Sequence, residues 1–115
     1  MVEPPRILAP KLFNTPAAAL DYEVAQEKAA TLGRLGRGLE AALAELHDHN
    51  TQAQETSAEQ KQKHRALVAQ AGHALWMFVV QREALGLRDS RQLMRDYGVP
   101  PEVQGRMGML PAKAR

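Results

Sequence analysis

Six consecutive apolar residues, Leu75–Val80, lie within a stretch whose neighbours are charged and helix-forming. A helix completes one turn in about 3.6 residues, so these six side chains point in every direction around the axis. A helix that is apolar on all sides has to be buried on all sides. Because one neighbouring helix covers only one side, this segment requires at least two partners.

The sequence around this segment predicts two long helices and two short ones. Thr15 followed by Pro16 is typical of a helix start, since the hydroxyl caps the first turn and proline there needs no N–H partner. Apolar residues then recur at helical spacing, namely Ala18, Tyr22, Ala25, Ala29, Leu32, Leu35, Leu39, Leu43 and Leu46. We expect helices at about 16–49, 57–86, 90–97 and 101–107, and no strand. The fold class is therefore all-α.

Capping signals separate these helices. Thr56 and Glu59 have the spacing of a capping box at the start of the second long helix. Asp89 followed by Gln92 starts the first short helix, and Gly98 ends it. The expected organisation is an extended proline-rich arm at 1–14, a single helical domain at 15–108 and a frayed tail at 109–115.

A short connector makes the two long helices an antiparallel hairpin. Folding the chain about residue 53 pairs residues whose numbers add to roughly 106, so that Leu39 meets Leu67. The same register places Gly33 and Gly36 opposite Gly72, where small residues allow a close approach of the helices. Each glycine inside a helix costs about 1 kcal/mol relative to alanine, which such packing would explain. A glycine-rich phosphate cradle is the alternative, but it normally follows a strand.

The apolar segment also predicts self-association. Leu75 and Phe78 face the first long helix, and four residues require a second partner: Trp76, Met77, Val79 and Val80. A second copy of the chain would complete a four-helix bundle as a homodimer, with Gln81 and Glu83 at its seam. Two alternatives remain open, which are cover by the short C-terminal helices alone and cover by an unidentified protein partner.

Charged residues suggest three weaker hypotheses. Arg82 lies on the apolar stripe, where the expected register brings it near Asp21 and Tyr22; this predicts a structural ion pair or, alternatively, a small-ligand or anion site. His47 and His49 flank Asp48 like metal ligands. However, positions two apart on a helix point about 200° apart, so we expect a solvated helix end and no metal.

The third hypothesis concerns nucleic acid. A basic face is expected on the first short helix, formed by Arg88, Arg91 and Arg95, and residues 90–108 resemble a helix-turn-helix. Only Gln104 and Arg106 would read base edges, and Gly105 weakens their helix. We therefore favour a solvated face and a helical cap over the hairpin, with weak nucleic-acid binding as the alternative.

Composition narrows the function classes. The chain has 115 residues, no cysteine and a net charge of +2. Disulfides and thiolate metal sites are thereby excluded, and no segment reaches the roughly 18 apolar residues of a membrane span. The two serines, Ser57 and Ser90, lie at expected caps, and no catalytic pair is apparent. We expect a cytoplasmic, non-enzymatic interaction or scaffold protein without a cofactor.

Four stretches together resemble a known family: ALDYE at 19–23, LGRLGRGLE at 32–40, LWMFVVQREALGLRDS at 75–90 and DYGVPPEVQGRMG at 96–108. The family is a small group of helical proteins, known mostly from alphaproteobacteria, that carry a domain of unknown function. The resemblance covers about residues 19–108. It implies an all-helical cytoplasmic protein of alphaproteobacterial origin, and it implies no activity, ligand or catalytic residue.

Overall fold

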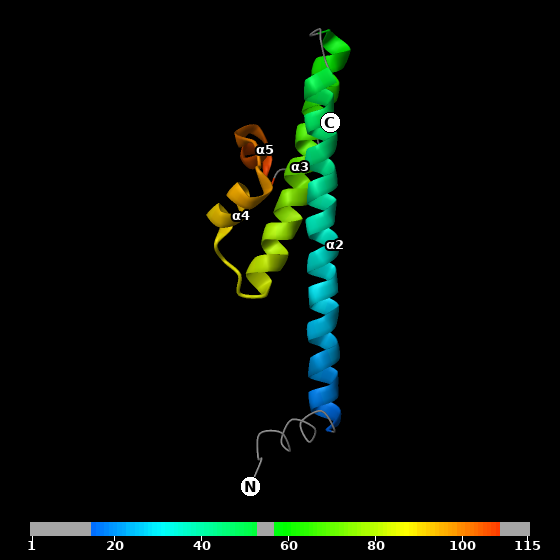
Figure 1. Ribbon diagram of the computed structural model, residues 1–115, viewed down its shortest axis with the longest axis vertical. Helices are drawn as coiled ribbons and strands as arrows, with labels where there is room; N and C mark the ends of the chain where they lie inside the picture. The colour runs from blue at the N-terminus through cyan, green and yellow to red at the C-terminus, as the bar shows by residue number, and fades with distance from the viewer. Residues whose placement is uncertain (1–14, 53–56, 109–115) are drawn as a thin grey trace. The chain divides into compact units, whose positions relative to one another are not determined.

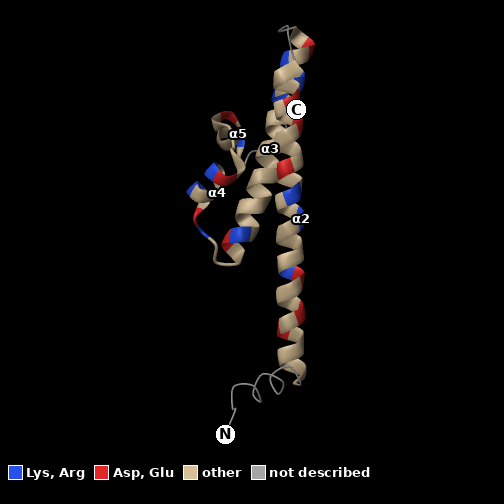
Figure 2. Ribbon diagram, viewed as in Figure 1, with Lys and Arg blue, Asp and Glu red and all other residues tan. Residues whose placement is uncertain are grey.

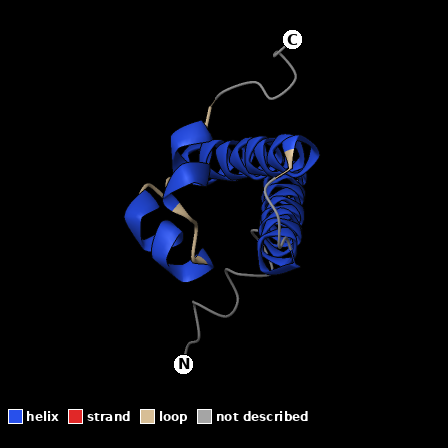
Figure 3. Ribbon diagram, turned by 90° about the horizontal axis from the view of Figure 1, so that it is seen from above, coloured by secondary structure: helices blue, strands red, loops and turns tan. Residues whose placement is uncertain are grey.

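The computed structural model describes residues 15–52 and 57–108, and within these ranges every element is a helix (Figure 3). The elements are α2 (Pro16–Gln52), α3 (Ala58–Ala84), α4 (Ser90–Tyr97) and α5 (Pro101–Arg106). The all-α prediction is confirmed. α2 runs three residues beyond the expected end at His49, and α4 has the expected bounds.

The helix ends follow the capping chemistry of the sequence in most places. The Thr15 hydroxyl accepts a hydrogen bond from the Ala18 amide at 3.1 Å, and the Asp89 carboxylate accepts one from the Gln92 amide at 3.2 Å. Gly98 closes α4 in the left-handed region, with φ of 59°. The cap of α3 is Ser57, whose hydroxyl accepts from the amide of residue 60 at 3.2 Å. The predicted capping box began one residue earlier, at Thr56, which lies outside the described residues.

The chain divides into two units, Met1–Gly33 and Arg34–Arg115, and the boundary lies inside α2. The sequence predicted one domain across this point. In the first unit, none of the described residues 15–33 is buried. The second unit contains the hydrophobic core, which comprises Leu39, Ala42, Leu46, Leu67, Val68, Ala69, Ala71, Leu75, Phe78, Val79, Leu93, Val99 and Val103.

Within the second unit, α3 runs antiparallel to the C-terminal half of α2 (Figure 1). Two side-chain contacts fix the register: Gln70 Nε2 donates to Glu45 Oε1 at 3.4 Å, and Nδ1 of His64 lies 3.0 Å from Oδ1 of Asn50. These paired residue numbers add to 115 and 114, whereas the sequence predicted about 106.

The predicted hairpin register is therefore wrong, by a slide of about eight residues. Apolar positions in both helices recur at spacings of three and four, which repeat every seven residues. A slide of about one repeat leaves apolar residues opposite apolar residues, so the pattern alone does not select between the two alignments. The observed register places Leu39 beside Leu75, and both side chains are 0% exposed.

Gly36 and Gly72 do not have the partners that the predicted register assigned to them. A Cβ atom added to Gly36 would lie 3.1 Å from the Tyr97 hydroxyl and 3.2 Å from Cζ of Phe78. One added to Gly72 would lie 2.9 Å from Cβ of Arg106 and 3.1 Å from its carbonyl carbon. Both glycines are sites of close packing, but Gly36 accommodates two aromatic side chains and Gly72 accommodates the backbone of α5.

The short helices thus cover a second side of α3. α5 packs directly against α3, and Val103 on α5 is 0% exposed. The Tyr97 ring at the end of α4 meets the Phe78 ring edge to face, with centroids 5.5 Å apart. α3 consequently has two covered sides, one facing α2 and the other facing α5.

Candidate interaction surface

A third side of α3 is left uncovered and is apolar. Trp76 is 39% exposed, Met77 39% and Val80 46%, although all three belong to the apolar run at the centre of the helix. On a helix Val80 lies four residues after Trp76 and three after Met77, so the three side chains adjoin one another. We call these three residues the α3 apolar face.

Val79 does not belong to this face. Its side chain is only 7% exposed in the single chain, which leaves it little surface to offer a second copy. Val79 follows Gly72 by seven residues and therefore lies on the same side of α3 as that glycine. At Gly72, that side packs against α5.

The stretch of α3 that carries the apolar face has no charged residue of its own. No Lys, Arg, Asp or Glu occurs from Ala66 to Gln81, and the middle of α3 is accordingly tan in Figure 2. These 16 residues extend about 24 Å along the helix axis. His73 stands beside Trp76, with ring centroids 6.2 Å apart, and the two rings can each donate a hydrogen bond.

The described chain ends at the edge of this face. Gly108 has a φ of 89°, and a Cβ atom added there would lie 3.7 Å from Cδ1 of Trp76. The end of the described C-terminal segment therefore borders one side of the indole ring. Trp76, Met77 and Val80 nevertheless keep more than a third of their surface exposed.

The residues of the predicted ligand or anion site lie in different units. Asp21 and Tyr22 belong to the first unit, where Tyr22 is 51% exposed and its hydroxyl accepts from Gln26 Nε2 at 3.3 Å. Arg82 belongs to the second unit, with its guanidinium carbon 5.9 Å from the centroid of the Phe78 ring. The register that grouped these residues is wrong within residues 34–115, so the grouping loses its main support and stays a prediction.

The predicted basic face is smaller than expected. Arg88 precedes α4, which starts at Ser90 after the Asp89 cap, so Arg88 is not on the helix. Arg91 and Arg95 are exposed one turn apart on α4. Arg95 donates to Gln92 Oε1 at 2.7 Å, and Gln92 donates to Asp96 Oδ1 at 2.8 Å. Arg95, Gln92 and Asp96 therefore form a short series of hydrogen bonds on this face, which ends at a carboxylate.

Of the two residues expected to read base edges, Gln104 is hydrogen-bonded within the protein and Arg106 is half-buried. Gln104 Nε2 donates to the Val99 carbonyl oxygen at 3.0 Å. The backbone of Arg106 packs on Gly72, and its Nε atom is buried with no hydrogen-bond partner among the described residues. α5 has six residues and packs on α3, as a helical cap would.

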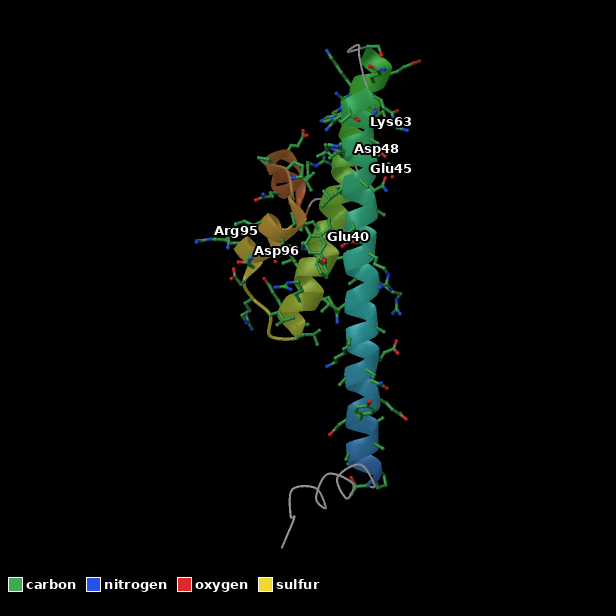
Figure 4. All side chains as sticks on the ribbon, viewed as in Figure 1. Glu40, Glu45, Asp48, Lys63, Arg95 and Asp96 are labelled. Carbon is green, nitrogen blue, oxygen red and sulfur yellow. The ribbon has the colours of Figure 1, made fainter. Side chains whose placement is uncertain are left out.

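An open groove of about 640 Å³ runs between α2 and α4. Its walls carry Glu40 and His47 from α2 and Asp96 from α4; Figure 4 labels the two carboxylates. Leu43 and Tyr97 also line the groove. Among the described residues, no three His, Asp or Glu side chains lie close enough together to hold a metal ion, and this includes His47, Asp48 and His49.

His64 joins three helices, a role that the sequence did not indicate. On α3, its Nδ1 contacts Asn50 of α2 and its Nε2 lies 3.0 Å from Oε1 of Glu102 on α5. Both partner atoms are oxygens, so the ring donates to both only when it is doubly protonated. The partners are 14 and 38 residues away in sequence: the hairpin register brings Asn50 to the ring, and the packing of α5 on α3 brings Glu102.

Comparison with known protein families identifies the family of this chain. A family model described as a family of unknown function, DUF6665, matches residues 8–115. The chain belongs to this family. The match begins earlier and ends later than the resemblance at 19–108, and it includes the connector between α2 and α3. No curated protein and no solved structure matches the chain. Within the described residues, no helix is both long enough and apolar enough to cross a membrane.

Proposed function

We propose that this member of DUF6665 is a non-enzymatic helical interaction protein that binds a second copy of itself through the α3 apolar face. The observation that supports the proposal is the exposure of Trp76, Met77 and Val80 at 39–46%, although they lie next to the buried residues Leu75, Phe78 and Val79 of the same helix. Burial of such side chains contributes about 1.5–3 kcal/mol each when it is complete. Contiguous exposed apolar surface of this kind is typical of protein interfaces.

The polar residues near the face are compatible with a two-fold partner. When two α3 helices pack antiparallel with Met77 opposite Val80, Glu83 of the second copy lies within one turn of Trp76 and His73. These rings are the hydrogen-bond donors of the face, and a carboxylate is a suitable acceptor for both. A buried indole N–H normally requires such a partner. The face therefore complements itself under two-fold symmetry, as an isologous interface must.

The test uses Val80→Lys, with Val24→Lys as the matched control. Both valines are similarly exposed, at 46% and 43%, but Val24 lies in the first unit. Sedimentation velocity across a dilution series should show an association that Val80→Lys weakens at least about tenfold, because a charge would be buried in the interface. Val24→Lys should leave it unchanged. A natural chain that stays monomeric at all concentrations, or equal effects of the two variants, would contradict the proposal.

Trp76 provides an independent readout because it is the only tryptophan in the chain. Its emission should shift to shorter wavelength as the concentration rises, since association removes the indole from water. The same concentration series of Val80→Lys should keep the emission of the dilute natural chain. A shift that is independent of concentration would show that the C-terminal part of the same chain, and no second copy, covers the ring.

A cytoplasmic location and an origin in the alphaproteobacteria, both expected from the sequence, are part of the proposal. Cell fractionation with an antibody against the protein tests the first. Recovery in the periplasmic or membrane fraction would contradict it.

A further inference from the structure

The N-terminal part of α2 has an apolar stripe that continues from the buried one. Gly36, Leu39 and Leu46 are buried in the second unit. At the same spacing toward the N-terminus follow Leu32, Ala29, Ala25, Tyr22 and Ala18. Among these, Tyr22, Ala25 and Ala29 are exposed. α2 is 37 residues long and α3 only 27, so α3 is too short to accompany the whole stripe.

An exposed helical segment of this length needs packing to be stable. Most helical stability in proteins comes from an amphipathic face in contact with a partner, and residues 16–33 have no buried face. The spacings of three and four residues are those of a coiled coil, in which Tyr22 and Ala29 take one core position and Ala18, Ala25 and Leu32 take the other. Leu20 and Val24 lie on a different side, where Glu27 interrupts the apolar pattern.

The charges beside the stripe indicate the occupant. Asp21 and Lys28 each precede a core position and lie on the same edge of the stripe, seven residues apart. Neither has a hydrogen bond or ion pair among the described residues. They are two turns apart, about 10.5 Å along the axis, which is too far for a direct ion pair within one helix.

We propose that residues 15–32 of α2 form an antiparallel two-fold coiled coil with the same residues of a second copy. When residue numbers in the two copies add to 47, Thr15 lies opposite Leu32, and the overlap covers the whole unburied segment. Tyr22 then packs on Ala25 of the second copy, and Ala18 packs on Ala29, so that each layer joins residues of compatible size. Asp21 lies next to Lys28 of the second copy, twice by symmetry.

The same charges disfavour the competing arrangements. A sum of 54 also aligns the core positions, but it brings Lys28 next to Lys28 of the other copy. In a parallel pair, Asp21 and Lys28 would face Gln26 and Gly33 of the partner, which form no ion pair with them. Only the antiparallel register with a sum of 47 matches opposite charges.

The experiment is a charge swap, made in the full chain carrying Val80→Lys so that the α3 apolar face does not contribute. Sedimentation equilibrium should show a dimer. Asp21→Lys alone and Lys28→Asp alone should each raise its dissociation constant about tenfold, because two attractive pairs become repulsive. The double variant should return to within about threefold of the background. Because the two residues cannot pair within one chain, this rescue has to arise between chains.

Glu23→Lys is the matched control, since Glu23 lies on the outer side of the proposed coiled coil. It should change the dissociation constant by less than about twofold. If the chain carrying Val80→Lys is monomeric at all concentrations, the coiled-coil proposal is wrong, whereas the proposal for the α3 apolar face is unaffected. A loss of dimer in both single variants without rescue in the double variant also overturns it. Persistence of the dimer with Val80→Lys, together with rescue, supports it whatever the outcome for α3.

Discussion

The two halves of α2 form one continuous helix but differ in what holds them in place. Residues 34–52 bury Gly36, Leu39, Ala42 and Leu46, whereas residues 16–33 bury no side chain. Both halves carry the same apolar spacing. The difference lies in their packing: the second half contributes to the core of the second unit, which α3 also lines, whereas the described residues of the first half contribute no buried side chain.

An apolar stripe indicates which side of a helix packs against a partner, but it does not indicate whether that partner belongs to the same chain. In residues 34–52 the partner is α3 of the same molecule. In residues 16–33, and on the third side of α3, the same kind of surface remains exposed. We accordingly expect substitutions in the two halves to have different effects on unfolding, and the predictions below compare matched residues.

The largest expected difference is between two leucines of α2. Leu39 is 0% exposed and Leu20 is 59% exposed. Leu39→Ala should lower the free energy of unfolding by about 3 kcal/mol, because it leaves a cavity in the core. Leu20→Ala should change it by less than about 0.5 kcal/mol. Urea denaturation followed by circular dichroism measures both, and comparable losses would show that the first half of α2 is as well packed as the second.

A smaller effect is expected from adding a methyl group at Gly72. The new Cβ would lie 2.9–3.1 Å from three atoms of Arg106, two of which belong to the backbone. Gly72→Ala should therefore destabilise the protein by about 1–3 kcal/mol, since α5 has to shift. Gly38→Ala is the control, because its Cβ would meet nothing within 4 Å. It should stabilise the second unit by up to about 1 kcal/mol through helix propensity, and a loss there would contradict the assigned packing.

The third prediction applies one substitution to both halves of α2. Ala30 and Ala41 are both exposed, and glycine costs about 1 kcal/mol relative to alanine in a helix. Ala41→Gly should lower the global free energy of unfolding by about that amount. Ala30→Gly should leave global unfolding unchanged in dilute solution and reduce only the helical signal, because residues 16–33 unfold locally. Hydrogen exchange distinguishes the two, and an equal fall in global stability would mean that α2 unfolds as one unit.

How much of this could be predicted depends on the range of each interaction. Caps such as Thr15 and Asp89 involve residues three apart, and the sequence predicted them. Val79 was assigned to a dimer interface because its burial within the single chain depends on tertiary packing that no local pattern specifies. The hairpin register was wrong because apolar residues recur so regularly on both helices that a slide of eight or nine residues still sets apolar positions opposite one another, as with Leu39 and Leu75. His64 was missed because its partners are brought to it by the observed register and by the packing of α5 on α3.

The smallest expected effect concerns the contact that ties the second half of α2 to α3 and α5. His64→Ala removes the contacts with Asn50 and Glu102, each 3.0 Å long in the natural chain. The side chains of His64 and Glu102 are 33% and 47% exposed, so solvent screens the pair and the loss should be below about 1 kcal/mol. A double-mutant cycle with Glu102→Gln isolates the pair, and we expect a coupling of a few tenths of a kcal/mol. His47→Ala, an exposed histidine on the same hairpin, should change stability less. A coupling of zero would mean that the pair of His64 and Glu102 contributes nothing to holding α5 against α3.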